Sequence, residues 1–205
     1  MTKKFAFLLV AIFTTILAVG VVHTSLRAQD SSVLKASFNP DGSVKIPQNW
    51  RTWIYMGTPF TPNALNDGKA PFPEFHNVYI EPSAFAHFKK TGKFANGTQI
   101  VKELALVRQK AKDEMYKDGS TDEVSGRGYF QGEFQGLELA YKDTGRFSKE
   151  PGGWVYFSFG HKAQPYNKSA KAFKSESCNA CHQASAATDY VFTQFYPVLR
   201  AEMKK

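Results

Sequence analysis

The stretch RGYFQGEFQGLELAY, residues 127–141, alternates apolar or small residues with polar ones, which predicts a long β-strand. Residues two apart share a face of a strand. One face then carries Phe130, Gly132, Phe134, Gly136 and Glu138. Glu133 lies on the other face, together with two glutamines. Glycines on a strand face often mark something bulky close to the backbone, so Glu138 is a candidate site residue.

More strands are predicted on both sides of this stretch, because runs rich in aromatic and β-branched residues recur between Pro- and Gly-rich segments. These runs are NWRTWIYMG (49–57), HNVYI (76–80), GTQIVKELALV (97–107) and GGWVYFSFGH (152–161). Helices are predicted for EPSAFAHFKKTG (81–92), for part of the charged segment 108–126, and for most of residues 169–205 with an interruption at Pro197. Strands followed by helices predict the α+β class, with an antiparallel sheet-rich domain and flanking helices.

The N-terminal residues predict export from the cytoplasm. Lys3 and Lys4 precede an uncharged apolar run over residues 5–22, which is typical of a secretory signal. We therefore expect a signal peptide over residues 1–28 and a single periplasmic domain over residues 29–205; a retained membrane anchor over residues 5–22 is the alternative.

The charge of the chain argues against a nucleic-acid partner. The formal net charge is +8, and three of the basic residues lie in the predicted signal. The remaining basic residues form no cluster or stripe, so a nucleic-acid function is not expected.

Both cysteines of the chain lie in SESCNACHQASAA, residues 175–187. The order Cys178, Cys181 and His182 is the C-x-x-C-H signature of covalent c-type haem attachment. Each cysteine would bond to one vinyl group, and His182 would ligate the iron from this helical segment. A redox-active disulfide usually starts a helix in a βαβ unit, which is not visible here. A zinc site needs about four ligands, which leaves one missing.

Four ionisable residues fall on otherwise apolar strand faces. They are His76, Lys102, Glu138 and His161. His76 shares its predicted face with Val78, and His161 follows Phe159. Each alone is explained by a strand end that reaches water or by a satisfied core group, and residues 102–117 also fit a helix. Together the four predict a polar lining within a hydrophobic pocket.

Several longer strings resemble the cytochrome P-460 family. They are FHNVYIEP, TGKFANGTQIVKEL, GYFQGEFQGLE, WVYFSFGH and CNACHQASAATDYVFTQFYPVL. The resemblance runs from Ala36 to Leu199. Cytochrome c′-beta is a close relative with the same fold, and it binds gases rather than oxidising a substrate. One departure is the segment Arg108–Val124, which is longer and more charged than the family pattern.

The resemblance implies a homodimeric antiparallel-sheet protein that oxidises hydroxylamine to nitric oxide or nitrous oxide. It implies one haem c bound at Cys178 and Cys181, with His182 as the iron ligand and an open distal position. It also implies that Lys102 is bonded to a haem meso carbon and that Glu138 accepts protons. Electrons would pass to a soluble acceptor, such as another cytochrome.

Two rival functions remain open at this point. One is a nitric oxide carrier of the cytochrome c′-beta type without the lysine bond, in which Phe60, Phe72 or Phe75 caps the iron. The other is an electron-transfer cytochrome with a sixth iron ligand. Its candidate ligands are Met56, Met115, His76 and His161.

Overall fold

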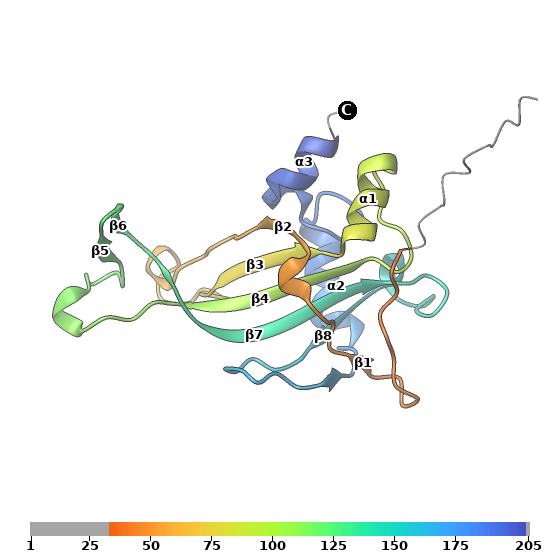
Figure 1. Cartoon of the computed structure of the whole chain (residues 1–205), viewed down its shortest axis with the longest axis horizontal. Coiled ribbons are helices and arrows are strands. Elements are labelled where there is room, and N and C mark those ends of the chain that lie inside the picture. Colours follow the sequence, from red (N-terminus) through yellow and green to blue (C-terminus); the bar gives the residue numbers. More distant parts are fainter. Residues whose placement is uncertain (1–32, 204–205) are drawn as a thin grey trace, which may run out of the picture. The chain divides into compact units, whose positions relative to one another are not determined.

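The computed structural model describes residues 33–203 (Figure 1). The predicted signal peptide, residues 1–28, lies outside the described residues and stays a prediction, as does a single domain over residues 29–205. Within residues 33–203, no helix is both long and apolar enough to cross a membrane.

A five-stranded antiparallel sheet forms the body of the described chain, in the order β2-β3-β4-β7-β8. Its strands are β2 Ile54–Gly57, β3 Phe75–Ile80, β4 Gln99–Val107, β7 Gln131–Lys142 and β8 Trp154–Ser158. Two-stranded pairs are formed by β1 Val44–Lys45 with β9 Ser169–Ala170, and by β5 Thr121–Glu123 with β6 Gly126–Gly128. The β5–β6 hairpin extends away from the main sheet, at the left of Figure 1. The sheet and helices confirm the predicted α+β class.

Three α-helices accompany the sheet: α1 Pro82–Thr91, α2 Ser175–Ser185 and α3 Pro197–Met203. The sequence defines both ends of α1. At the start, the Glu81 carboxylate accepts a hydrogen bond from the Ala84 amide at 2.9 Å. At the end, Gly92 has a φ of 69°, the left-handed conformation that stops a helix.

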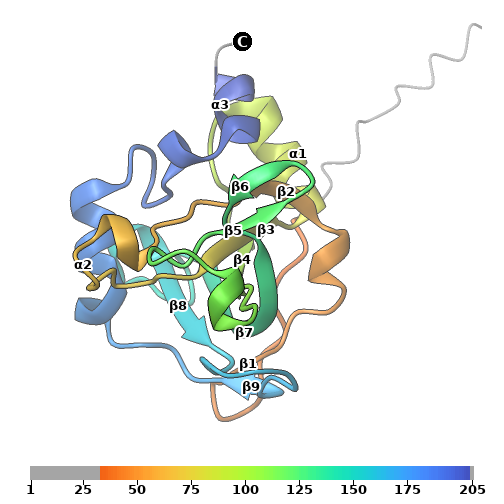
Figure 2. The same cartoon turned by 90° about the vertical axis from the view of Figure 1, so that its left-hand side faces the viewer.

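The two faces of the main sheet carry different layers. The face covered by the helices, called the α2 face here, packs Ile80 and Ile100 with Phe88 of α1 and Leu199 of α3. The opposite face, called the β1 face here, packs Val101, Leu139 and Phe157 with Val44 of β1. Figure 2 shows α2 beside β8 and the β1–β9 pair at the bottom of the view.

Strand register decides which side chains meet on the α2 face. Val78, Lys102, Glu138 and Ser158 are successive partners across β3, β4, β7 and β8. In the next row, His76 pairs with Leu104, and Leu104 pairs with Gly136. His76, Lys102 and Glu138 therefore share one face, as the alternation predicted.

Two irregularities in β7 correct part of the predicted pattern. Leu104 pairs with Gly136, but Ala105 pairs with Phe134, so an extra residue bulges out of β7 between them. The bulge places Phe134 on the β1 face, and the prediction that Phe134 shares a face with Glu138 is wrong. A second shift lies between Ala105 and Val107. Glu133 is exposed, as predicted.

The β7 glycines lie against the chain itself. A Cβ at Gly132 would come within 3.0 Å of the Arg108 Cα, and a Cβ at Gly136 within 3.4 Å of the Gly160 carbonyl oxygen. The bulky neighbour that we expected beside these glycines is therefore the protein itself, namely the Arg108 backbone at Gly132 and the Leu104 side chain with the Gly160 backbone at Gly136.

Four other local predictions need correction. Residues 49–57 begin with a short 3-10 turn, Trp50–Thr52, before β2. Segment 108–126 contains only the 3-10 turn Lys112–Glu114 and most of the β5–β6 hairpin, so neither a helix there nor one over residues 102–117 forms. Pro197 begins α3 rather than interrupting a helix, because proline is well suited to the first helical position. Within the described residues 169–203, the chain is less helical than predicted, since β9 and an irregular stretch flank α2.

An ion pair between an exposed arginine and a buried carboxylate stabilises the β1 face. The Glu103 side chain is fully buried, and both of its oxygens accept hydrogen bonds from Arg51, at 3.0 and 2.6 Å. Tyr166 donates a third bond at 3.0 Å. The Arg51 guanidinium also lies 4.6 Å from the centre of the Phe134 ring, a cation–π contact that the β7 bulge makes available.

We expect Arg51→Ala to lower the free energy of unfolding by about 2–3 kcal/mol. Loss of one partner from a fully buried pair costs roughly 3–5 kcal/mol, and the partly exposed Arg51 reduces that figure. Urea denaturation followed by fluorescence measures the change. The paired replacement of Arg51 and Glu103 by leucine should cost less than Arg51→Ala, because no buried charge is left unpaired. An unchanged denaturation midpoint for Arg51→Ala would contradict this account.

Candidate functional site

Lys102 and Glu138 form an ion pair on the α2 face. The Lys102 Nζ lies 2.7 Å from Glu138 Oε2, and each side chain is 26% exposed. The Lys102 ammonium also lies 4.4 Å from the centre of the Phe72 ring. Phe72 comes from the loop before β3, so this loop supplies the aromatic side of the site. Lys102, which the sequence places on an otherwise apolar strand face, is thus partly exposed to solvent and paired with a carboxylate.

His76 lies diagonally from Lys102 on the same face. Burial, reinforced by the charge of Lys102, lowers the pKa of His76 to about 4, so the imidazole is neutral at neutral pH. Its ring packs edge-on against Phe72, with centroids 5.9 Å apart. Its Nε2 atom is buried and has no hydrogen-bond partner. Such a buried nitrogen is unusual unless a water or a ligand satisfies it.

His161 reaches the α2 face by a different route from the one predicted. Strand β8 ends at Ser158, and Gly160 has a φ of 113°, so the alternation with Phe159 is broken. The His161 Nε2 lies 2.7 Å from Oε1 of Glu74, whose side chain is 6% exposed. Glu74 interacts electrostatically with His76. Sequence reasoning missed Glu74 because it precedes β3 in a loop, where alternation gives no signal.

Helix α2 brings the C-x-x-C-H motif beside β8 (Figure 2). The amide of the buried Asn179 fixes the helix, because it donates to the Trp154 carbonyl and to the Ser175 hydroxyl at 3.2 Å each. Cys178 is half-buried, Cys181 is exposed, and both thiols are free. Burial, followed by the charge of Glu138, raises the pKa of Cys178.

The His182 ring is oriented by one backbone carbonyl. Its Nδ1 lies 2.7 Å from the Tyr190 oxygen. Because a carbonyl only accepts, Nδ1 carries the hydrogen and Nε2 keeps a free lone pair. The ring also packs against Tyr156 and Phe192, with centroids 4.5 and 4.6 Å away. Burial lowers the pKa of His182, which favours the neutral imidazole that ligates metals.

An unusual turn presents the Tyr190 carbonyl to His182. Asp189 and Tyr190 both have positive φ angles, 44° and 62°, which are costly for residues other than glycine. The Asp189 carboxylate holds the turn, because it lies 2.5 Å from the Lys142 Nζ and 3.3 Å from the Trp154 indole nitrogen. No local sequence pattern predicts this support.

The two halves of the site act on each other electrostatically. The charges of Lys102 and Glu138 affect both Cys178 and His182, so the ion pair and the motif lie in one neighbourhood. The hydroxyl of Tyr156, whose ring packs against His182, is buried without a hydrogen-bond partner. Two free thiols in a C-x-x-C-H motif and an imidazole nitrogen with a free lone pair are the features that a covalently bound haem requires. The residues present fit such a group.

The rival interpretations find less support. Within residues 33–203, no three His, Cys, Asp or Glu side chains gather into a metal-binding cluster. Met56 packs in the core of the α2 face. Met115 accepts a hydrogen bond from the Lys110 amide within the segment Arg108–Val124. Of the three proposed caps, Phe60 and Phe75 stack on each other, with ring centroids 4.0 Å apart. Phe72 is the one that contacts Lys102.

An antiparallel sheet that presents a C-x-x-C-H helix beside a lysine–glutamate pair defines a haem-binding cytochrome. The Cytochrome P460 family model matches residues 47–193 of the chain. Since the match covers more than half of its length, the chain belongs to the cytochrome P460 family. The family implies a haem cofactor and haem-based oxidation. A search of curated proteins finds no match to the chain.

Proposed function

We propose that this protein is a periplasmic c-type cytochrome that oxidises hydroxylamine to nitric oxide or nitrous oxide. The observation that carries the proposal is the Lys102–Glu138 pair on the same sheet face as the C-x-x-C-H helix. In this proposal Cys178 and Cys181 hold haem c by thioether bonds, and His182 Nε2 ligates the iron. Lys102 is bonded through Nζ to a meso carbon of the porphyrin. The bound haem supplies the electron-accepting chemistry and an open position for the substrate nitrogen.

Glu138 is the proposed proton acceptor in this reaction. Formation of the bond at Nζ removes the ammonium charge of Lys102, which leaves the Glu138 carboxylate without its cationic partner. The partly exposed Glu138 carboxylate is then free to accept protons from the substrate nitrogen. Phe72, from the loop before β3, lies over the Lys102 side chain at this site.

The partners follow from this chemistry. Oxidation of hydroxylamine releases electrons, so a soluble acceptor cytochrome is proposed as the redox partner. A homodimer and a periplasmic location are proposed with it, on the family resemblance and the predicted export signal.

A second function is favoured by one specific contact. Phe72 lies beside Lys102, where an aromatic ring would shield a bound gas from water. A protein with an unlinked Lys102 would then bind nitric oxide in the manner of cytochrome c′-beta. The state of Lys102 distinguishes the two functions.

We expect Lys102 to be absent as a free lysine in the mature protein. Trypsin should release FANGTQIVKELALVR, residues 94–108, joined through the porphyrin to SESCNACHQASAATDYVFTQFYPVLR, and mass spectrometry detects the joined species. A meso bond also perturbs the porphyrin, so the ferrous absorption bands should lie well to the red of those of an ordinary c-type haem. Lys102→Ala should restore the ordinary spectrum and lose hydroxylamine oxidation.

The exposed Lys89 on α1 provides the matched control, since Lys89→Ala should leave the spectrum unchanged. Recovery of unmodified Lys102 in full yield, with an ordinary c-type spectrum, would leave nitric oxide binding as the better proposal.

A further inference from the structure

A buried carboxylate on the α2 face has no role in the reaction proposed above. Glu74 is 5% exposed, its Oε1 lies 2.7 Å from His161 Nε2, and its Oε2 is buried without a partner. Burial of a carboxylate is costly unless its oxygens are paired. This half-satisfied acid is therefore a feature that requires an explanation.

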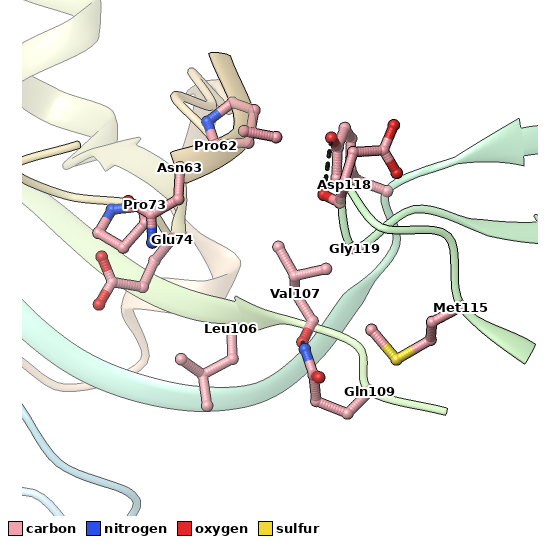
Figure 3. A pocket seen from close by; sticks show the side chains of 12 residues that line it. Pro62, Asn63, Pro73, Glu74, Leu106, Val107, Gln109, Met115, Asp118 and Gly119 are labelled. Carbon is pink, nitrogen blue, oxygen red and sulfur yellow. Dashed lines mark hydrogen bonds between the residues drawn. The ribbon is translucent and has the colours of Figure 1, made fainter. Parts of the chain in front are cut away.

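Glu74 also lines a cleft of about 410 Å³ between the loop before β3 and the segment Arg108–Val124. Figure 3 shows the Glu74 side chain on one side of this cleft, with Asp118 and Gly119 on the other. The floor of the cleft includes Leu106 and Val107 from the end of β4. Glu74 thus both contacts His161 and lines a cleft that opens to solvent.

Polar groups continue from the Lys102–Glu138 pair towards Glu74. His76 lies in the row next to that pair, and its Nε2 is buried and unpaired, as is Glu74 Oε2. The charged groups that act on His76 are Lys102 of β4, Glu138 of β7 and Glu74. Two buried polar atoms without partners in one neighbourhood are the setting in which an ordered water bridges them.

His161 is the most exposed of these polar groups, since its side chain is 49% exposed and contacts Glu74. It comes close to Glu74 because the backbone of Gly160 and His161 crosses directly over Gly136. A side chain at Gly136 would meet the His161 Cα at 3.5 Å and the Leu104 side chain at 3.2 Å. The absence of a side chain at Gly136 therefore allows the backbone of His161 to lie close to the α2 face.

We propose that His76, Glu74 and His161 form a proton path between the Glu138 side of the site and bulk solvent. The inference rests on the proposed function for the source of its protons. Hydroxylamine becomes nitric oxide by loss of three protons and three electrons, and the electrons pass to the acceptor cytochrome. Each proton accepted by Glu138 moves to His76 Nε2, then by water to Glu74 Oε2. His161 releases one proton to solvent for each proton that enters, so the path returns to its starting state.

The path is tested by pH-jump kinetics of the ferric holoprotein, without hydroxylamine. Rapid mixing changes the pH, and the haem absorption reports when the interior groups have re-equilibrated. We expect Glu74→Gln and His161→Gln to slow this relaxation by roughly 10²-fold, as for other lost proton-transfer groups, while the final spectra stay unchanged. Glu133→Gln on the exposed part of β7 and His87→Gln on α1 are matched controls that should relax at the normal rate.

The outcomes separate this inference from the proposed function. Normal relaxation in both Glu74→Gln and His161→Gln would overturn the path. Slow relaxation in a protein that does not oxidise hydroxylamine would support the path and refute the proposed function. If Glu74→Gln fails to retain haem, the half-exposed His161→Gln carries the test, and Glu74→Asp, which keeps the carboxylate, should relax faster than Glu74→Gln.

Discussion

A chain that carries both Cys178→Ala and Cys181→Ala is expected to lose all of its covalently bound haem. These are the only two thiols in the sequence, so no other residue can form a thioether. Neither thiol makes a disulfide, and both are at least partly accessible, so their removal should leave the sheet intact. Haem staining of a denaturing gel measures the loss, and far-ultraviolet circular dichroism measures the fold.

Two variants of the same helix sharpen the result. Ser177→Ala, directly before the motif, should retain haem fully. His182→Ala should still form thioethers, but it removes the proposed iron ligand that the Tyr190 carbonyl orients, so the spin state of the ferric iron should change. Undiminished haem on the gel for the double cysteine variant would refute c-type attachment.

The strands of the sheet were predictable because each has a strong local pattern. Apolar and aromatic alternation placed β3, β4, β7 and β8 within a few residues of their observed bounds. The ends of α1 followed from Glu81, Pro82 and Gly92, whose effects depend on neighbouring residues only. The α+β class required nothing beyond this order of elements.

Features that depend on pairing between strands were not predictable in the same way. The β7 bulge that moves Phe134 to the β1 face is set by how β7 aligns with β4, and alternation within one strand carries no such information. A helix is predicted in segment 108–126 because charged residues with good helix propensity fill residues 108–117, but the structure has only a 3-10 turn there. The β5–β6 hairpin that follows pairs residues 121–128, which have weak strand character.

The candidate site shows the same division. Alternation identified Lys102 and Glu138 individually, but only the register makes them direct neighbours at 2.7 Å. His161 was selected for the wrong reason, since Gly160 breaks the strand before it. Glu74 and the Asp189 turn lie in loops, whose side-chain positions are fixed by contacts distant in sequence. Sequence patterns therefore found the groups on strands and missed the loop residues that support them.

Glu138→Ala is expected to slow hydroxylamine oxidation by about 10²–10⁴-fold, the usual contribution of a positioned general base. The side chain is partly exposed and does not belong to either hydrophobic cluster, so haem content and the ferric resting spectrum should remain close to those of the unmodified protein. Steady-state assays with an artificial electron acceptor measure the rate. Glu138→Gln keeps the shape but not the base, and it should be nearly as slow as Glu138→Ala.

Glu133 is the matched control, because it lies on the same strand and is exposed to solvent, so Glu133→Ala should retain nearly the full rate. The β7 bulges lie between Gln131 and Gly136, whereas Glu138 pairs with Lys102 in the regular part of the strand. The structure thus assigns Glu138 to the α2 face independently of the alternation that first indicated it. A normal rate for Glu138→Ala with haem fully bound would show that another group accepts the substrate protons. His76 would then be the next residue to replace, since it is a neutral imidazole in the row next to Lys102 on the same face.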